Sequence, residues 1–147
     1  MLYIGSDHRG YKLKEYIKEY LDDRAIKFED MGTNNEKESD YPEFAQKVGK
    51  KVSRTHNRGI LICGSGAGMT IAANKIKGVY AALAANPAMA RAIKEQDDVN
   101  ILVLAANFTS KEDAKAILNS WFESEYNRQD RHQRRIDQIK KIENKNF

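Results

Sequence analysis

The sequence predicts an α/β fold: a single Rossmann-like domain, a three-layer α/β/α sandwich built on a five-stranded parallel sheet. Two observations carry this prediction. Five short apolar runs recur along the chain, and stretches with the apolar spacing of helices separate them. Strands that alternate with helices in this way form parallel sheets that are covered on both faces. The length suits one domain, and neither a linker nor a repeat divides residues 1–147.

The five apolar runs have the composition of buried strands. The run at 100–105 is continuous and apolar enough for the centre of a sheet, and the run at 26–31 is ended by Gly32. The expected strands cover residues 2–4, 26–31, 60–63, 79–83 and 100–105.

Helical patterns fill the segments between these runs. Leu13, Ile17 and Leu21 recur at four-residue spacing, which indicates an amphipathic helix after the first strand. Asp40 is placed to cap a second helix, with Pro42 in its first turn. Further helices are expected over 69–74, 88–94 and 110–121, followed by a basic C-terminal helix over about 128–144.

Composition excludes several classes of protein. A hydrophobic content of 41% and a charged content of 31% suit a globular chain. No apolar run approaches the length of about 18 residues that crosses a bilayer, so we expect no membrane partner. The single cysteine excludes an internal disulfide and suits a reducing compartment, so we expect the cytoplasm.

The net charge of +4 is concentrated in residues 128–147, where seven Lys and Arg face three acidic residues. Such a segment is usually a solvated helix face, but it also suits phosphate or nucleic acid. Phe147 is its only aromatic residue, so base stacking has no support and no nucleic-acid partner is expected. Arg131 and Arg135 are four residues apart, which places both on one helix face and suits phosphate binding, although spacing alone leaves a plain surface role equally open.

A glycine-rich loop follows the third expected strand. Residues 64–68 contain three alternating glycines between a buried strand and a helix start, an arrangement that points backbone N–H groups at an anion. Cys63 lies at the lip of this loop, where a nearby helix N-terminus favours its thiolate as a nucleophile or base. The alternative is that Cys63 is a small buried apolar residue.

The loop does not match the common phosphate-binding motifs. Met69 stands where a dinucleotide fingerprint needs its last glycine, where a P-loop needs lysine, and where a thiol phosphatase needs arginine. Phosphoryl transfer is therefore not expected, and no cluster of metal-ligating residues accompanies the thiol. Other polar residues follow the first and fifth strands, Asp7 and His8 in one case and Asn107 in the other. Parallel strands end at one edge of their sheet, so we expect a site there.

Together these motifs resemble ribose-5-phosphate isomerase type B and the related galactose-6-phosphate isomerases. The resemblance runs from about residue 2 to 142 and rests on the segments 5–8, 40–42, 60–66, 72–75, 131–132 and 135. It implies an aldose–ketose isomerase of phosphorylated sugars, with ribose 5-phosphate and ribulose 5-phosphate of the pentose phosphate pathway as first candidates. It also implies that no metal or organic cofactor is needed. The expected assembly is a homodimer whose sites combine residues of both subunits, either alone or as one half of a tetramer.

The resemblance assigns roles to individual residues. Cys63 would remove the proton from the carbon beside the carbonyl, and Ser65 with the loop amides would stabilise the enediolate, as preorganised donors do. The amides would be those of Gly64, Ser65, Gly66, Ala67 and Gly68. The other substrate contacts would be Asp7, His8 and Tyr41, and the phosphate would be held by Arg131 and Arg135 with His132 near them.

Three positions depart from the family pattern and are expected to share one wall of the pocket. Gln96 replaces the histidine that opens the sugar ring, Asp97 replaces an asparagine that contacts substrate, and Asn107 replaces an arginine. Ring opening then passes to Asp97 or His8, or the substrate is another sugar phosphate (a hexose or an acyclic one), or the protein binds sugar phosphates with little turnover. Retained isomerase chemistry is favoured because Cys63 and its loop are intact.

Overall fold

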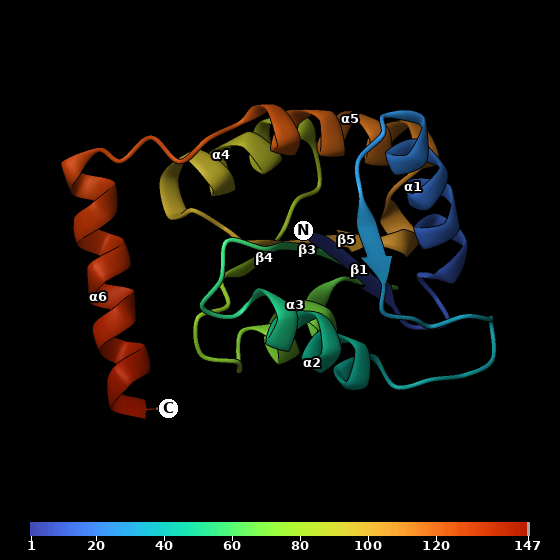
Figure 1. The fold of residues 1–147 in the computed structure, drawn as a ribbon, viewed down its shortest axis with the longest axis horizontal. Coiled ribbons are helices and arrows are strands. Elements are labelled where there is room, and N and C mark those ends of the chain that lie inside the picture. The colour runs from blue at the N-terminus through green and yellow to red at the C-terminus, as the bar shows by residue number, and fades with distance from the viewer. Residues whose placement is uncertain (147) are drawn as a thin grey trace.

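In a computed structural model that describes residues 1–146, five strands form one fully parallel sheet in the order β2-β1-β3-β5-β4 (Figure 1). The central strands are the longest, as expected for continuous apolar runs buried on both faces. The strands are β1 (Leu2–Ser6), β2 (Phe28–Asp30), β3 (Arg58–Cys63), β4 (Ala81–Leu83) and β5 (Ile101–Ala105).

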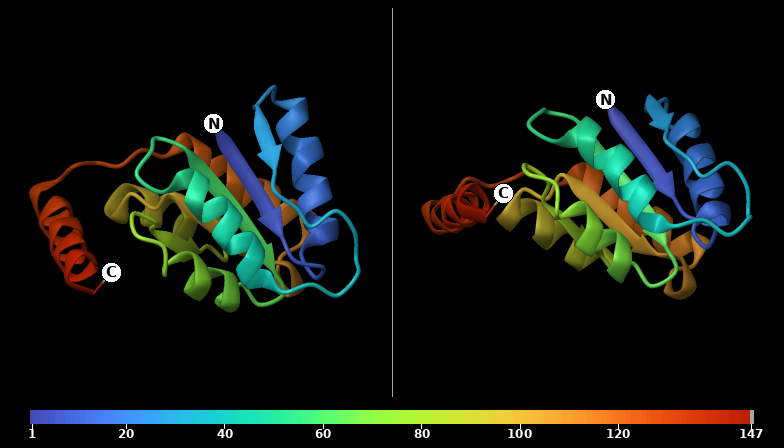
Figure 2. Two further views of the ribbon diagram at one scale, coloured as in Figure 1. Left: turned by 60° about the horizontal axis from the view of Figure 1, so that its bottom comes forward. Right: turned by 90° about the horizontal axis from the view of Figure 1, so that it is seen from below.

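Helices cover both faces of the sheet and make it the middle of three layers (Figures 1 and 2). One layer contains α1 (Tyr11–Asp23), α4 (Pro87–Asp97) and α5 (Lys111–Glu123), and the other contains α2 (Tyr41–Val52) and α3 (Ala67–Ala73). Because strand side chains alternate between faces, Ile60 and Ile62 pack with the first layer, and Leu61 and Cys63 with the second. The core therefore fixes the face on which the Cys63 thiol lies.

The last helix, α6 (Asp130–Asn146), lies at one end of the molecule, after the connecting segment 124–129 (Figures 1 and 2). Only His132 and Ile136 of this helix are buried, whereas Ile139 and Ile142 are 40% and 61% exposed. No helix within residues 1–146 is long and apolar enough to cross a membrane.

The expected fold class and all five strands are confirmed, with differences at the ends of elements. The edge strands β2 and β4 are shorter than predicted, since each has a hydrogen-bonded neighbour on one side only. Asp40 precedes α2 but its side chain makes no capping hydrogen bond, whereas Ser110 caps α5 by accepting from the N–H of Asp113. The fourth helix continues to Asp97 instead of ending at Lys94, and its cap is Asn86.

Candidate active site

The ends of three central strands bring one group of predicted residues together. In the parallel register Ser6 pairs with Ile62, and Cys63 pairs with Ala105, so the segments that follow β1, β3 and β5 meet at the carboxyl edge of the sheet. The helix after β1 covers one face and the helix after β3 covers the other. Such a switch point opens a crevice where ligands bind in open α/β sheets.

The loop after Cys63 keeps its glycines for steric reasons. Gly66 has φ +77°, and a Cβ there would lie 2.7 Å from Leu83 Cδ1. The first N–H groups of a helix have no partner within it, and here only that of Ala67 is taken locally, by Ser65 Oγ at 3.3 Å. The start of α3 is therefore able to donate to an anion beside Cys63, which is 4% exposed and packs against the α2 and α3 layer.

Tyr41, the first residue of α2, lies over this loop. A Cβ on Gly68 would overlap the Tyr41 ring, with Cε2 at 2.9 Å. Only glycine allows the aromatic ring to lie directly on the backbone at this point, and Tyr41 remains 38% exposed. Tyr41 is thus positioned as an apolar wall next to the loop.

Asp7 and His8 are held rigidly at the end of β1. Asp7 Oδ1 accepts from the N–H groups of Arg9 and Gly10 at 3.0 and 3.1 Å and is almost fully buried. His8 Nδ1 accepts from the N–H of Ser39 at 3.1 Å, and the N–H of His8 donates to Ser39 Oγ at 3.0 Å. A neutral His8 therefore carries its proton on Nε2, which is free to donate.

Gln96 and Asp97 lie at the opposite edge of the sheet. They occupy the exposed end of α4, just before Asp98, whose carboxylate pairs with Arg58 at 3.6 Å. Arg58 begins β3, and Cys63, five residues further along, is about 16 Å away at strand spacing. Within one chain the three atypical positions do not form a single wall, because α4 runs antiparallel to the strands and Asn107 alone lies beside the glycine loop, donating its N–H to Gly64 O at 3.0 Å.

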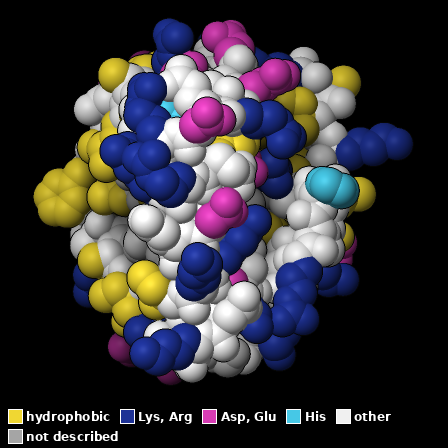
Figure 3. All heavy atoms as spheres, turned by 90° about the vertical axis from the view of Figure 1, so that its left-hand side faces the viewer, with side chains coloured by type: hydrophobic (Ala, Val, Ile, Leu, Met, Phe, Trp, Pro, Cys, Tyr) yellow, Lys and Arg dark blue, Asp and Glu magenta, His cyan; other side chains and the backbone are white. Residues whose placement is uncertain are grey.

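The predicted phosphate residues on α6 also lie at that distant edge. The connecting segment before α6 is held to α4 by the N–H of Asn127, which donates to Glu95 O at 3.1 Å. His132 points into its own chain, with Nδ1 at 2.7 Å from Asn127 Oδ1, and thus anchors the helix instead of facing outward. Arg131 and Arg135 are exposed, on a side of the molecule where Lys and Arg side chains gather (Figure 3).

Two residues that the sequence analysis did not select belong to the carboxyl-edge group. Ser39 pairs with His8, and Arg9 lies over Gly64. Ser39 is part of a polar segment without a periodic pattern, so nothing in the sequence marks it. Arg9 directly follows Asp7 and His8, and its position after a strand end was the available signal.

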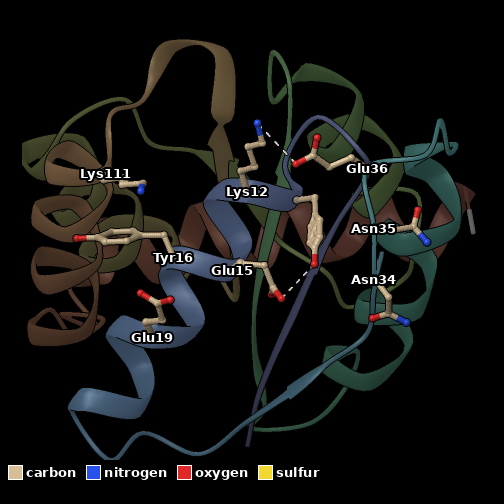
Figure 4. A pocket seen from close by; sticks show the side chains of 9 residues that line it. Lys12, Glu15, Tyr16, Glu19, Asn34, Asn35, Glu36 and Lys111 are labelled. Atoms are coloured by element: carbon tan, nitrogen blue, oxygen red, sulfur yellow. Dashed lines mark hydrogen bonds and ion pairs between the residues drawn. The ribbon is translucent and has the colours of Figure 1, made fainter.

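A separate hollow of about 620 Å³ lies between α1, residues 34–36 and Lys111 (Figure 4). In it Lys12 Nζ is 3.7 Å from Glu36 Oε1, and the Tyr11 hydroxyl donates to Glu15 Oε1 at 3.4 Å. It contains neither the thiol nor a histidine, so its size does not make it the reactive centre. Within the described residues 1–146, no group of three or more His, Cys, Asp and Glu side chains is arranged to hold a metal ion.

The carboxyl-edge group combines a thiol, backbone N–H donors and a fixed imidazole N–H. A thiolate is a base for a carbon acid, and N–H donors in a preorganised loop stabilise the oxyanion that proton removal creates. The arrangement suits abstraction of a proton beside a carbonyl. The cations expected for a phosphate, Arg131 and Arg135, are not brought to this group by the same chain.

The ribose/galactose isomerase family model matches residues 2–139. The chain is 42% identical to the putative sugar phosphate isomerase YwlF of Bacillus subtilis, over 98% of this chain and 97% of that protein. It is 36% identical to ribose-5-phosphate isomerase B of Escherichia coli, over 95% and 94%.

Solved structures agree over nearly the whole chain. Ribose-5-phosphate isomerase B of Clostridium thermocellum matches with a TM-score of 0.96 and 40% identity, over 99% of both chains. The Mycoplasma genitalium enzyme of the same name, solved with bound ribulose-5-phosphate, matches with a TM-score of 0.92 and 38% identity, over 97% of this chain and 95% of that one.

Proposed function

Because the chain belongs to the ribose/galactose isomerase family, we propose that it interconverts an aldose phosphate and a ketose phosphate, first of all ribose 5-phosphate and ribulose 5-phosphate. The observation that carries this proposal is the buried Cys63 thiol at the end of β3, next to a glycine loop whose helix start offers N–H groups. The ribulose-5-phosphate bound to the Mycoplasma genitalium relative supports the same ligand class here.

The proposed reaction uses Cys63 as a shuttle for one proton. Its thiolate removes the hydrogen from C2 of the open-chain aldose, the C–H electrons form the C1–C2 double bond, and the carbonyl electrons move to O1. The N–H groups near Gly66 and Gly68 stabilise this enediolate. The Cys63 thiol then returns the proton to C1, and the hydroxyl proton of O2 passes to O1 to complete the ketose. Because a thiol base must stay reduced, we place the protein in the cytoplasm.

The test is isomerisation by purified wild type, Cys63→Ala and Cys63→Ser, with solvent deuterium exchange at C2 as a second readout. Loss of a general base reduces the rate by about 10²–10⁴-fold, and both variants should lose isomerisation and exchange together. A Cys63→Ala protein with wild-type rates contradicts the base assignment. Matched melting temperatures would show that both variants are folded.

We further propose that a complete site combines the carboxyl edge of one chain with the α4 end and α6 of a second copy. The support is the separation of about 16 Å between Cys63 and the Arg58 end of β3, where Gln96, Asp97 and α6 gather. The exposed Ile139 and Ile142 give α6 an apolar face for such a partner.

Mixing two inactive proteins tests the shared site. Cys63→Ala and a double Arg131→Gln, Arg135→Gln variant should each be inactive alone. After exchange of subunits, half of the dimers contain one intact site, and activity should return to about a quarter of wild type. Sites built within one chain predict no recovery at all.

Gln96 and Asp97 favour a second candidate, an isomerase of a different sugar phosphate or a binding protein with little turnover. Gln96 does not transfer protons at neutral pH, so ring opening falls to His8 Nε2–H or Asp97 in this proposal. A panel of pentose, hexose and acyclic aldose phosphates, assayed with wild type and Gln96→His, separates the cases. If Gln96→His is more active than wild type on ribose 5-phosphate, ring opening limits the rate of the wild-type enzyme. No gain together with activity on another sugar means altered specificity, and ligand stabilisation without turnover means binding alone.

A further inference from the structure

The side chain of Arg9 lies over the backbone at Gly64, beside the Cys63 thiol. If Gly64 carried a Cβ, that atom would lie 2.9 Å from Arg9 Cδ and 3.5 Å from Arg9 Nη1. The amide nitrogen Nδ2 of Asn107 would lie 3.0 Å from the same point. Arg9 and Asn107 therefore flank Gly64, the residue that follows Cys63, and the absence of a side chain at Gly64 is what admits them.

No carboxylate in residues 1–146 forms an ion pair with this guanidinium. The nearest acid along the chain, Asp7, uses Oδ1 for the backbone N–H groups of Arg9 and Gly10. Arg9 is also exposed. A guanidinium is charged at every physiological pH and presents five donors, so an unpaired one at the carboxyl edge of the sheet is suited to an anionic ligand.

We propose that Arg9 binds the phosphate group of the sugar phosphate at the carboxyl edge of its own chain. This inference rests on the proposed function and adds a specificity-determining residue to it. Phosphate is the only ionised group of such a substrate, and the arginine fork matches its oxygens. The family resemblance leads one to expect an arginine at position 107, where this chain has an uncharged amide, and Arg9 brings a guanidinium to the same place.

The position of Arg9 also orients the substrate. The donors proposed for the enediolate lie on the α3 side of Cys63, at Gly66 and Gly68, whereas Arg9 reaches Gly64 from the end of β1. The reacting carbon then lies over the thiol, and the phosphate lies between Arg9 and Asn107. From α6 of a second copy, Arg131 and Arg135 complete the cation set.

Two measurements on Arg9→Gln test the proposal, with Arg24→Gln as the matched control. Arg24 is an exposed arginine at the end of α1 that stacks on the Tyr20 ring, 3.8 Å from its centroid, away from Cys63. The first measurement is calorimetric binding of inorganic phosphate, and the second is the kinetics of ribose 5-phosphate isomerisation. Loss of a charge-assisted contact should raise the phosphate Kd and the substrate KM by about 10-fold or more, with kcat within about 3-fold.

A rescue experiment tests whether the guanidinium group of Arg9 accounts for the lost phosphate affinity. Asn107→Arg introduced into Arg9→Gln restores a guanidinium beside Gly64 and should recover most of the lost phosphate affinity. Arg9→Lys keeps the charge without the fork and should fall between wild type and Arg9→Gln. Arg24→Gln should match wild type in both measurements.

The binding of phosphate does not require turnover. The proposed role of Arg9 and the proposed isomerase function can therefore be contradicted independently of each other. A wild type that isomerises nothing, together with loss of phosphate binding in Arg9→Gln, overturns the proposed function and supports Arg9. An Arg9→Gln protein with wild-type melting temperature, phosphate Kd and KM overturns the role of Arg9 and leaves the isomerase intact.

Discussion

His8 and Ser39 are joined by two reciprocal hydrogen bonds between backbone and side chain, across 31 residues of sequence. The N–H of Ser39 donates to Nδ1 of His8 at 3.1 Å, and the N–H of His8 donates to Oγ of Ser39 at 3.0 Å. The first bond holds the ring and fixes the neutral tautomer with its proton on Nε2, and the second holds the backbone at His8. The segment before α2 therefore presets the histidine that faces the carboxyl edge.

Ser39→Pro removes the N–H that holds Nδ1 and should release this tautomer. In ¹⁵N-detected spectra we expect the neutral form of His8 to carry its proton on Nε2 in wild type and to be a mixture of tautomers in Ser39→Pro, with kcat/KM lowered by about 10-fold. Ser39→Ala keeps the N–H and is the matched control, with the wild-type tautomer. Identical His8 spectra in Ser39→Pro and wild type would refute the interpretation.

Gly68→Ala should displace the Tyr41 ring. The backbone of Gly68 does not require glycine by its φ angle, so the cost arises from overlap with the ring, and overpacking of this kind costs about 1–3 kcal/mol. We expect a lower unfolding free energy in urea and a higher KM. The double variant Tyr41→Ala, Gly68→Ala removes the overlap and should regain the stability but not the KM. A Gly68→Ala protein as stable as wild type would show that the ring moves aside freely.

Asp30→Asn should be strongly destabilising. Lys14 is 1% exposed and its Nζ lies 2.7 and 2.6 Å from the two Asp30 oxygens, with Lys18 Nζ at 2.9 Å. Burial raises the pKa of Asp30, but hydrogen bonds from Lys14 and Lys18 outweigh it, so the pKa is lowered. The Asp30 carboxylate contributes its full stabilisation at pH values above its pKa in the unfolded chain. This contribution is lost as the pH falls through its lower pKa in the folded protein, in strong acid. Removing one partner of a buried pair costs about 3–5 kcal/mol.

Urea unfolding checks this value. Lys14→Met combined with Asp30→Asn removes both charges and should recover most of the loss. The exposed pair of Glu43 and Lys47 gives the control, since Glu43→Gln should cost less than about 1 kcal/mol. A loss in Asp30→Asn no larger than in this control would contradict the prediction.

The sheet was predictable from the sequence because continuous apolar runs mark its buried strands. The place of Cys63 at the end of a central strand, beside a glycine loop, was also predictable, and its role as a site residue stays a prediction that rests on the chain entropy three nearby glycines cost. The locations of Gln96 and Asp97 were not, because they depend on how far α4 extends and on its antiparallel direction. Ser39 was missed because it lies in a polar segment without a periodic pattern, and its hydrogen bonds to His8 leave no trace in the residue types. Arg9 was missed although its position directly after Asp7 and His8 was a signal.

Lys94→Met should stabilise the protein at neutral pH. Burial, together with the nearby Arg58 charge, lowers the pKa of Lys94 to about 8, although Asp98 and Glu125 act against them. Lys94 keeps its proton up to about pH 10.4 in the unfolded chain, but only up to about pH 8 in the folded protein. Below pH 8 the buried charge therefore lowers the free energy of unfolding, and this destabilisation disappears as the pH rises to about 10.4. The Lys94 ammonium lies 4.4 Å from the Trp121 ring, which offsets part of the penalty. Methionine keeps the apolar contact with Trp121, so we expect a gain of about 1–2 kcal/mol at pH 7 in urea unfolding and a much smaller gain at pH 10.5.

Lys115→Met, at an exposed position on α5, should leave stability nearly unchanged at both pH values. A gain in Lys94→Met that does not depend on pH would mean that packing, and not the buried charge, is responsible.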